Sequence, residues 1–413
     1  MIKQLKLLDK MIVYLGLSHL SLCYSSAALI KGYKVTIVDF KKNVENYISG
    51  KFNVNEPKLN NILNKNKKNF LITYDFNYLK TAKIIFLAKD LKTSKKNKIE
   101  IQEIIDLLKK VRQLRNKKIL VIKSQVPVGF TRKLNWKKSL KFHYVETLVF
   151  GEAVDRAIYP ERIILGKYNN NIIIPKVLSR YIKKFFCPIL EMNYEESELT
   201  KGFINTYLVS QVITTNYLNE FSKKYQADWQ KIKNALQLDK RIGKLAYLNP
   251  GLGLSGGNVE RDLKTISDTR RSLKLHSNLT DLYLKNSNYY KEWPLRIIKK
   301  KCNNKSKIGI LGYTYKENTL SSKNSPSKLL LRFNYFLHDI LVDELKKLKE
   351  NKKLKFSKLE DVLKKSSLVC IFHNLEIYRK INFNKYPNIK IILDPYSFLK
   401  KNKISTASNY FNL

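Results

Sequence analysis

The segment that decides the fold is MIVYLGLSHLSLCYSSAALIKGYKVTIVDF, residues 11–40. A short apolar run ends at Gly16, a longer apolar run follows, and Gly32 separates that run from a second short one that ends at Asp39. Short apolar runs bounded by glycine are typical of buried strands, and a glycine directly after a longer run is typical of a helix C-terminus. The segment therefore predicts a strand over 11–15, a helix over 17–30 and a strand over 34–39.

A secretory signal peptide is the competing interpretation of the same residues. Basic residues, an apolar stretch and the small residues Ser25, Ser26 and Ala27 occur in the order that such a signal requires. The strand–helix–strand interpretation explains more, because it accounts for the apolar run VTIVD and for the place of Gly32. The four cysteines are isolated, with no C-x-x-C pair, which fits a reducing compartment, and we expect a cytoplasmic protein. No uncharged run approaches the length that crosses a bilayer, so no membrane partner is expected.

The remaining chain alternates between α/β and helical patterns. Further apolar runs predict strands at 70–74, 82–88, 118–124 and 142–148, with helical stretches such as 99–114 between them. Long helical runs fill about 191–284, and alternation returns after residue 307, with strands expected at 307–313, 339–343, 367–372 and 389–394 and a helix near 325–337. Strands that alternate with helices indicate parallel sheets. We therefore expect an α/β fold with two Rossmann-like parallel-sheet domains, residues 1–190 and 301–413, joined by a central all-helical domain, residues 191–300.

The net charge is the most conspicuous feature of the composition. The chain has 79 Lys and Arg against 34 Asp and Glu, which gives 79 − 34 = +45. A basic domain has the electrostatic footprint of a nucleic-acid-binding protein, and such binding would depend steeply on salt. The lysines, however, accompany Asn and Ile from end to end, and no nucleic-acid-binding module is recognisable. We interpret the charge as compositional drift and expect no nucleic-acid partner.

The first strand-to-helix turn is the candidate dinucleotide site. A dinucleotide fingerprint reads G-x-G-x-x-G, whereas this turn reads GLSHLS over 16–21, so Gly16 is kept and Ser18 and Ser21 replace the other glycines. Asp39, at the end of the second strand, is placed to accept hydrogen bonds from a ribose hydroxyl, which favours NAD. A Rossmann-like turn that binds no cofactor remains the alternative.

The most specific stretch is NPGLGLSGGNVERD, residues 249–262. Four of the 14 glycines of the chain fall between Gly251 and Gly257. In a chain poor in glycine, such a cluster predicts positive φ angles or a ligand pressed against the backbone. An ordinary flexible loop is the alternative, but it leaves the concentration of glycine unexplained.

At this loop the chain resembles the UDP-glucose/GDP-mannose dehydrogenase family, whose signature reads N-P-G-x-G-[FY]-G-G-x-C-[FL]-P-K-D. The resemblance continues in the same order over nearly the whole chain. The other matching segments are KSQVPVGFT (123–131), YPERIILG (159–166), ELTK with Asn205 (198–205), DKRIG (239–243) and the stretch from GILG to Ser-Pro (309–326). Several spaced motifs in order make the resemblance specific.

The resemblance implies an enzyme that oxidises the primary alcohol of a nucleotide sugar to a carboxylate in two NAD-dependent steps. It implies an N-terminal NAD-binding domain, a central domain that forms a homodimer and a C-terminal domain that binds the nucleotide sugar, most plausibly a UDP-sugar. The positions that match family cofactor contacts are Gly16, Ser18, Ser21, Asp39, Ser124 and Gln125. The positions that match substrate contacts are Arg241, Asn249, Gly253, Gly256, Gly257 and Lys316. No metal site is expected.

The resemblance also assigns catalytic roles. Lys201 and Asn205 match the residues that hold the oxygen at the reacting carbon, a suitable task for a cation and an amide, and their spacing puts both on one helix face. Asp262 matches the aspartate that manages the proton with a bound water. Glu146 matches a glutamate that activates water for hydrolysis.

Departures from the family pattern bear on the second oxidation. Asn258 stands where the family has its catalytic cysteine, and an amide cannot replace the thiolate that attacks the aldehyde. Other replacements are Gln125 for threonine, Phe150 for glutamate, Arg261 for lysine, and residues 89–92 (KDLK) for a V-P-T-P turn. The leading hypothesis is a diverged dehydrogenase that lacks the covalent step. The second is a pseudoenzyme that binds a nucleotide sugar or pairs with an active homologue.

Overall fold

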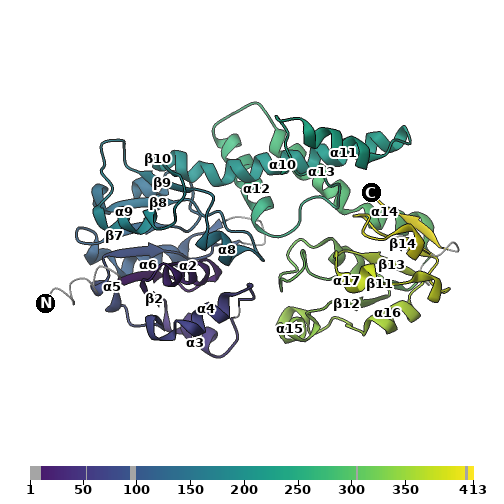
Figure 1. Ribbon diagram of the computed structural model, residues 1–413, viewed down its shortest axis with the longest axis horizontal. Coiled ribbons are helices and arrows are strands. Elements are labelled where there is room, and N and C mark those ends of the chain that lie inside the picture. Colours follow the sequence, from purple (N-terminus) through teal and green to yellow (C-terminus); the bar gives the residue numbers. More distant parts are fainter. Residues whose placement is uncertain (1–10, 53, 94–98, 304–305, 405–407) are drawn as a thin grey trace. The chain divides into compact units, whose positions relative to one another are not determined.

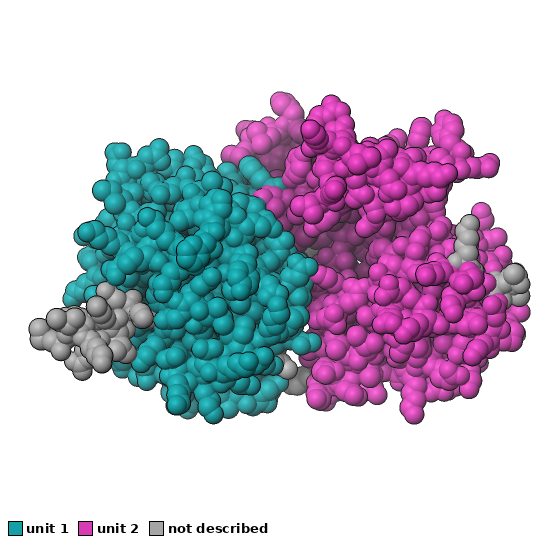
Figure 2. All heavy atoms as spheres, in the orientation of Figure 1, with its two compact units in different colours: residues 1–203 teal, residues 204–413 magenta. Residues whose placement is uncertain are grey.

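The computed structural model describes residues 11–52, 54–93, 99–303, 306–404 and 408–413. The chain folds as two compact units, residues 1–203 and 204–413, which Figure 2 colours teal and magenta. The expected boundary near residue 300 lies inside the second unit, and the division into three domains stays a prediction. Among the described residues, no helix is long and apolar enough to cross a membrane.

The first unit, coloured purple to teal in Figure 1, contains an eight-stranded sheet. The strand order in this sheet is β10-β9-β8-β7-β4-β1-β2-β3. Its strands are β1 (Met11–Leu15), β2 (Lys34–Val38), β3 (Phe70–Thr73), β4 (Ile84–Leu87), β7 (Ile119–Ile122), β8 (Lys141–Tyr144), β9 (Ile163–Lys167) and β10 (Ile189–Asn193). Six neighbouring strands of this sheet, in the order β3-β2-β1-β4-β7-β8, have the Rossmann order. In this order the chain adds strands on one side of β1 up to β3, and then adds strands on the other side from β4 onward. All pairs are parallel except β8 with β9. The six strands expected in this region are confirmed, whereas β9 and β10 were not expected.

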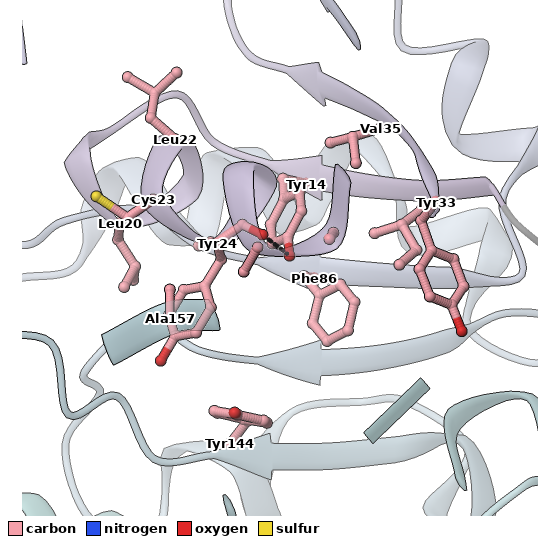
Figure 3. Close-up of a cluster of buried hydrophobic side chains, with 14 of the residues drawn as sticks. Tyr14, Leu20, Leu22, Cys23, Tyr24, Tyr33, Val35, Phe86, Tyr144 and Ala157 are labelled. Carbon is pink, nitrogen blue, oxygen red and sulfur yellow. Dashed lines mark hydrogen bonds between the residues drawn. The ribbon is translucent and has the colours of Figure 1, made fainter. Parts of the chain in front are cut away.

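Helices cover this sheet, and α2 (His19–Ile30) is the best buried of them. It packs against α8 (Ala153–Ile158) and α4 (Leu59–Lys65). Gly32, with φ of +81°, follows its C-cap, as expected. Beneath it lie the rings of Tyr14, Tyr24, Phe86 and Tyr144 (Figure 3), and the Tyr14 hydroxyl donates to the Tyr24 carbonyl at 3.1 Å. The remaining helices of the unit are α3 (Lys41–Ile48), α5 (Tyr78–Thr81), α6 (Gln102–Lys110), α7 (Phe130–Lys133) and α9 (Lys176–Lys183).

A long helix, α10 (Tyr194–Lys224), begins in the first unit and continues into the second. The second unit adds α11 (Trp229–Leu238), α12 (Asn258–Ser272), α13 (Leu279–Lys291) and α14 (Trp293–Lys301). Helices α12 and α13 pack together, and the Ser267 hydroxyl donates to Asp281 at 2.6 Å across their contact. This segment is helical as expected.

The second unit also contains a five-stranded parallel sheet with the order β12-β11-β13-β14-β15. Its strands are β11 (Ile308–Leu311), β12 (Tyr335–His338), β13 (Leu368–Ile371), β14 (Ile391–Leu393) and β15 (Asn409–Phe411). Numbered along the chain, these strands have the order 2-1-3-4-5, which is the second common order of doubly wound sheets. The point where the strand order reverses lies between β11 and β13. The expected α/β fold with two sheets and a central helical region is confirmed, with the second sheet parallel and the first parallel except at the pair of β8 and β9.

Two expectations in this sheet are wrong. The stretch 325–337 is a 3-10 helix, Pro326–Arg332, followed by β12, because a short apolar run does not by itself distinguish a helix from a strand. The stretch 339–343 is no strand, because the Asp339 carboxylate accepts the amides of Tyr313 at 2.8 Å and Leu341 at 3.0 Å and so ends β12 in a turn. The helix α15 (Val342–Lys347) follows.

Candidate functional site

The turn after β1 lies at the carboxyl edge of the first sheet, where the strand order reverses. Ligands of doubly wound sheets bind in the crevice at this point. Gly16 has φ of +102° there, and its amide donates to the Val38 carbonyl at 2.8 Å. Asp39 is fully buried at the end of β2, and its two oxygens accept the amides of Leu17 and Phe40, both at 2.6 Å. The structure thus brings Gly16 and Asp39 together, as the sequence predicts.

Lys89, the second residue after β4, lies across the same turn. Its ammonium is 2.7 Å from Asp39 Oδ2, 2.8 Å from Glu103 Oε1 and 3.2 Å from the Leu17 carbonyl oxygen. A Cβ atom added to Gly16 would lie 2.9 Å from Lys89 Cβ. The glycine is therefore required by the packing of Lys89, with or without a cofactor. The sequence showed Lys89 only as a departure from the family pattern, because nothing in it pairs residue 89 with residue 39.

The other predicted cofactor residues are engaged within the protein. Ser18 and Ser21 form a reciprocal capping box at the start of α2, and the Ser18 hydroxyl donates to the Ala88 carbonyl at 2.8 Å. The Ser124 hydroxyl accepts the Lys89 amide at 2.8 Å, and Gln125 follows it, half-buried. Gly16 and Asp39 have the residue types and positions that suit the adenosine ribose of a dinucleotide, but the Lys89 ammonium already binds the carboxylate that the ribose needs.

Two predicted catalytic residues meet within the first unit. Glu146 follows β8, and its Oε2 atom is 3.6 Å from the Lys201 ammonium on α10. The two side chains are 18% and 16% exposed, so water screens the pair only in part. The Glu146 carboxylate also accepts the Leu148 amide. This pair holds one negative and one positive charge at a fixed place and can exchange a proton with a bound water.

Two others meet within the second unit. The Asn205 amide nitrogen donates to Asp262 Oδ2 at 2.6 Å, which joins α10 to α12. The other oxygen of Asp262 is 3.3 Å from both Nε and a terminal nitrogen of Arg261. Asp262 is 2% exposed and Arg261 is 5% exposed. The guanidinium thus lies beside a buried carboxylate, and an ion pair with hydrogen bonds is how a buried charge is compensated.

The glycine loop is tightly packed. Gly253 and Gly256 have φ of +68° and +82°, which confirms the expected positive φ angles at two of the four glycines. Added Cβ atoms would lie 2.5 Å from the Tyr396 ring at Gly251, and 2.6 Å from the Lys323 side chain at Gly257. Glycine is needed here because protein side chains approach the backbone, a cause that the sequence alone could not separate from a ligand.

The remaining predicted residues lie in the second unit, where Asn258 precedes Asp262 by one helical turn on α12. Asn258 is the exposed first residue of α12. Arg241 is exposed and pairs with Asp239 at 2.6 Å, and the Asn249 side chain accepts a hydrogen bond from Lys233 at 2.7 Å. Lys316 lies in the turn after β11, where its carbonyl accepts the Thr314 hydroxyl at 2.9 Å. Their assignment as site residues stays a prediction.

Comparisons with known proteins agree with this fold. The chain is 31% identical over 173 residues to a UDP-glucose 6-dehydrogenase of Campylobacter jejuni, which covers 41% of this chain and 44% of that one. It is 23% identical over 398 residues to a UDP-glucose 6-dehydrogenase of Rickettsia felis, which covers 90% and 84%. Matches to two curated relatives span only 30% and 44% of those relatives' lengths. A UDP-glucose dehydrogenase structure from the archaeon Pyrobaculum islandicum has the same fold, with a TM-score of 0.83 at 19% identity over 97% of this chain and 96% of that one.

Family profiles match most of the chain. Residues 10–185 match the NAD binding domain of the UDP-glucose/GDP-mannose dehydrogenase family, which supports NAD as the cofactor. Residues 195–288 match the central domain of the same family. These two matches cover both the turn at Gly16 and the buried pair of Asn205 and Asp262. The chain belongs to the UDP-glucose/GDP-mannose dehydrogenase family.

Proposed function

We propose that this protein is an NAD-dependent dehydrogenase that oxidises the primary alcohol of a nucleotide sugar of the UDP-sugar class. The observation that carries the proposal is the 2.6 Å hydrogen bond between Asn205 and Asp262, buried beside Arg261. Family membership and the predicted roles of these two residues support it. The oxidised nucleotide sugar would be a precursor for polysaccharide synthesis.

The residues of the site have complementary tasks. Asp262 accepts one N–H of the Asn205 amide, and the second N–H of that amide can donate to an alcohol oxygen. The Asp262 carboxylate takes up the alcohol proton through a bound water. The Lys201 ammonium stabilises negative charge on the reacting oxygen. Bound NAD supplies the acceptor for the hydride.

We further propose that the reaction stops after one oxidation. The second step of the family needs a sulfur nucleophile, and Asn258 offers an amide whose nitrogen lone pair is delocalised. The cysteines lie at positions 23, 187, 302 and 370, so the glycine loop and α12 carry none. The product would be the aldehyde, or a hydrated aldehyde that is oxidised slowly without a covalent intermediate.

Replacement of the proton acceptor tests the reaction. With NAD and a panel of UDP-sugars, we expect Asp262→Asn to lower kcat by about 10²-fold or more, the usual contribution of a general base, while thermal unfolding shows a folded protein. Asp268→Asn is the matched control, because Asp268 lies on the same helix, partly exposed, and pairs with Lys264 at 3.0 Å. Equal rates for Asp262→Asn and the control would contradict the assigned role, and NADH formation with none of the sugars would favour a binding protein.

We also propose a homodimer formed through the central helices, in the cytoplasm. Aromatic side chains at the C-terminal end of α10 and directly after it are exposed, with exposed fractions of 59% for Tyr217, 53% for Phe221 and 72% for Tyr225. The Phe221 ring is 6.5 Å from that of Tyr217 and 5.3 Å from that of Tyr225. Exposed rings that lie this close together suit burial against a second copy. Light scattering should show a dimer for the wild type and a monomer for Phe221→Asp, and two identical masses would contradict this interface.

A further inference from the structure

We propose that Lys89 and Asp90 fill the dinucleotide crevice of this chain, so that NAD binds only after Lys89 releases Asp39. Lys89 would then be the residue that sets the affinity for NAD. The inference rests on one part of the proposed function, namely that NAD is the ligand of this crevice. It concerns binding alone and can be tested without any sugar.

The first step of the argument is the saturation of Asp39. A carboxylate has about four acceptor positions. Those of Asp39 receive the amides of Leu17 and Phe40, the Asn43 side chain at 2.8 Å and the Lys89 ammonium at 2.7 Å. A ribose diol that binds this carboxylate must displace one of these donors. Lys89 is the donor that follows another strand, β4, whereas Leu17 follows β1 and Phe40 and Asn43 follow β2, and its ammonium is carried on a flexible stem.

The second step is the position of Asp90. Its carboxylate lies 3.4 Å from the Leu20 amide, at the N-terminal end of α2. In a dinucleotide fold the pyrophosphate takes this place, because the helix amides and dipole attract an anion. Asp90 thus brings a negative charge to the phosphate position, while Lys89 brings a positive charge to the ribose position. Both changes oppose a dinucleotide.

The third step is that the second sheet repeats the arrangement. There the Gly312 amide donates to the His338 carbonyl at 2.9 Å, and Asp339 at the end of β12 accepts the Tyr313 amide at 2.8 Å. His373 follows β13 as Lys89 follows β4, and a Cβ atom on Gly312 would lie 2.5 Å from its ring. His373 is 2% exposed, so a buried side chain packs directly over Gly312 at this turn. The first sheet has the same arrangement, with Lys89 in the place of His373.

Calorimetric titration of the full chain with NAD alone tests the proposal. Lys89→Met keeps the stem that packs on Gly16 and removes the ammonium, and we expect its Kd for NAD to fall about tenfold or more relative to the wild type, because a charge-assisted competitor is lost. Lys89→Arg keeps the charge and should retain the weak affinity. Lys41→Met is the control for net charge, because Lys41 lies near Asp39 and pairs with Glu45 instead, and its Kd should not change.

Lys89→Met leaves Asp39 buried without its partner, so a second variant guards against misfolding. Asp90 is exposed, and Asp90→Asn should keep the fold and bind NAD severalfold more tightly. NAD should also raise the melting temperature of each variant more than that of the wild type. Wild-type affinity in both variants would overturn the proposal. If the variants bind NAD more tightly but no nucleotide sugar is oxidised, the proposal on Lys89 is supported and the proposed function is refuted. If the wild type oxidises a nucleotide sugar and its Kd for NAD equals that of both variants, the proposed function is supported and the proposal on Lys89 is refuted.

Discussion

Replacing Lys123 with methionine should stabilise the first unit. Lys123 follows β7 and is 1% exposed, and among the described residues its ammonium has no hydrogen-bond partner. It lies 3.0 Å from the centroid of the Tyr144 ring and 3.5 Å from that of Tyr24. Burial lowers the pKa of Lys123 well below its usual value, although the nearby Glu146 carboxylate acts in the opposite direction.

The size of the gain follows from these contacts. An unsatisfied buried polar group costs about 1–3 kcal/mol, and a desolvated cation–π contact returns about 2 kcal/mol. Methionine keeps the length of the stem and makes sulfur–aromatic contacts of about 0.3–1.5 kcal/mol. We expect Lys123→Met to raise the free energy of unfolding by about 1 kcal/mol, or the melting temperature by about 2–4 °C. Lys138→Met, which removes an exposed lysine 4.1 Å from the Tyr168 ring, is the control and should change stability by less than about 0.5 kcal/mol.

The pH dependence separates this cause from simple repacking. Because the pKa of Lys123 is lower in the folded state, the unfolded chain binds more protons between the two pKa values. The wild type should therefore gain stability as the pH rises through that interval toward the unfolded value of about 10.4, and Lys123→Met should lack this gain. Urea unfolding at pH 7 and pH 9.5 measures both. A variant that is less stable at both pH values, or two equal pH slopes, would refute the reasoning.

Two further predictions concern one residue in each unit, His143 and Gly253. Burial lowers the pKa of His143 to about 3. Below the unfolded value of about 6.5, the unfolded chain therefore gains a proton that the folded chain excludes. The free energy of unfolding should then fall by about 1.4 kcal/mol for each pH unit by which the pH is lowered. Unfolding curves between pH 6.5 and 4.5 should show this loss for the wild type and for His276→Gln, an exposed control, but not for His143→Gln. Gly253→Ala should cost about 3 kcal/mol or more, because its Cβ would lie 2.5 Å from the Ser287 carbonyl oxygen at a φ of +68°. Gly243→Ala, at φ of +79° with open space around it, should cost about 1–2 kcal/mol in the same denaturation assay, and equal losses would show that contact with Ser287 is unimportant.

Much of the fold could be predicted because local sequence patterns indicate its strands and helices. Apolar runs that end at Gly16 and Asp39 predict the first two strands, and the repeated alternation of strands with helices predicts parallel sheets. The helix expected near 325–337 is a short 3-10 helix followed by β12, because a short apolar run does not distinguish a helix from a strand. The turn at Asp339, where a strand was expected, depends on the amide of Tyr313, which follows β11. That contact is between residues distant in the sequence.

The site was predictable only in part for the same reason. The resemblance identified Asn205 and Asp262, and the structure adds that they form one hydrogen-bonded pair. The ion pair of Lys89 with Asp39 requires β4 to lie beside β1, which no local pattern reports. The packing of Tyr396 against Gly251 likewise depends on the fold of the second sheet.

The most direct test of the proposed function is the number of NADH molecules formed per nucleotide sugar. A limiting amount of UDP-sugar is incubated with excess NAD and the wild-type protein, and NADH is followed by absorbance while mass spectrometry identifies the product. With Asn258 at the nucleophile position, we predict about one equivalent of NADH, an aldehyde product, and no acyl group on the protein. Two equivalents formed at one rate, or a trapped covalent acyl intermediate, would contradict the account.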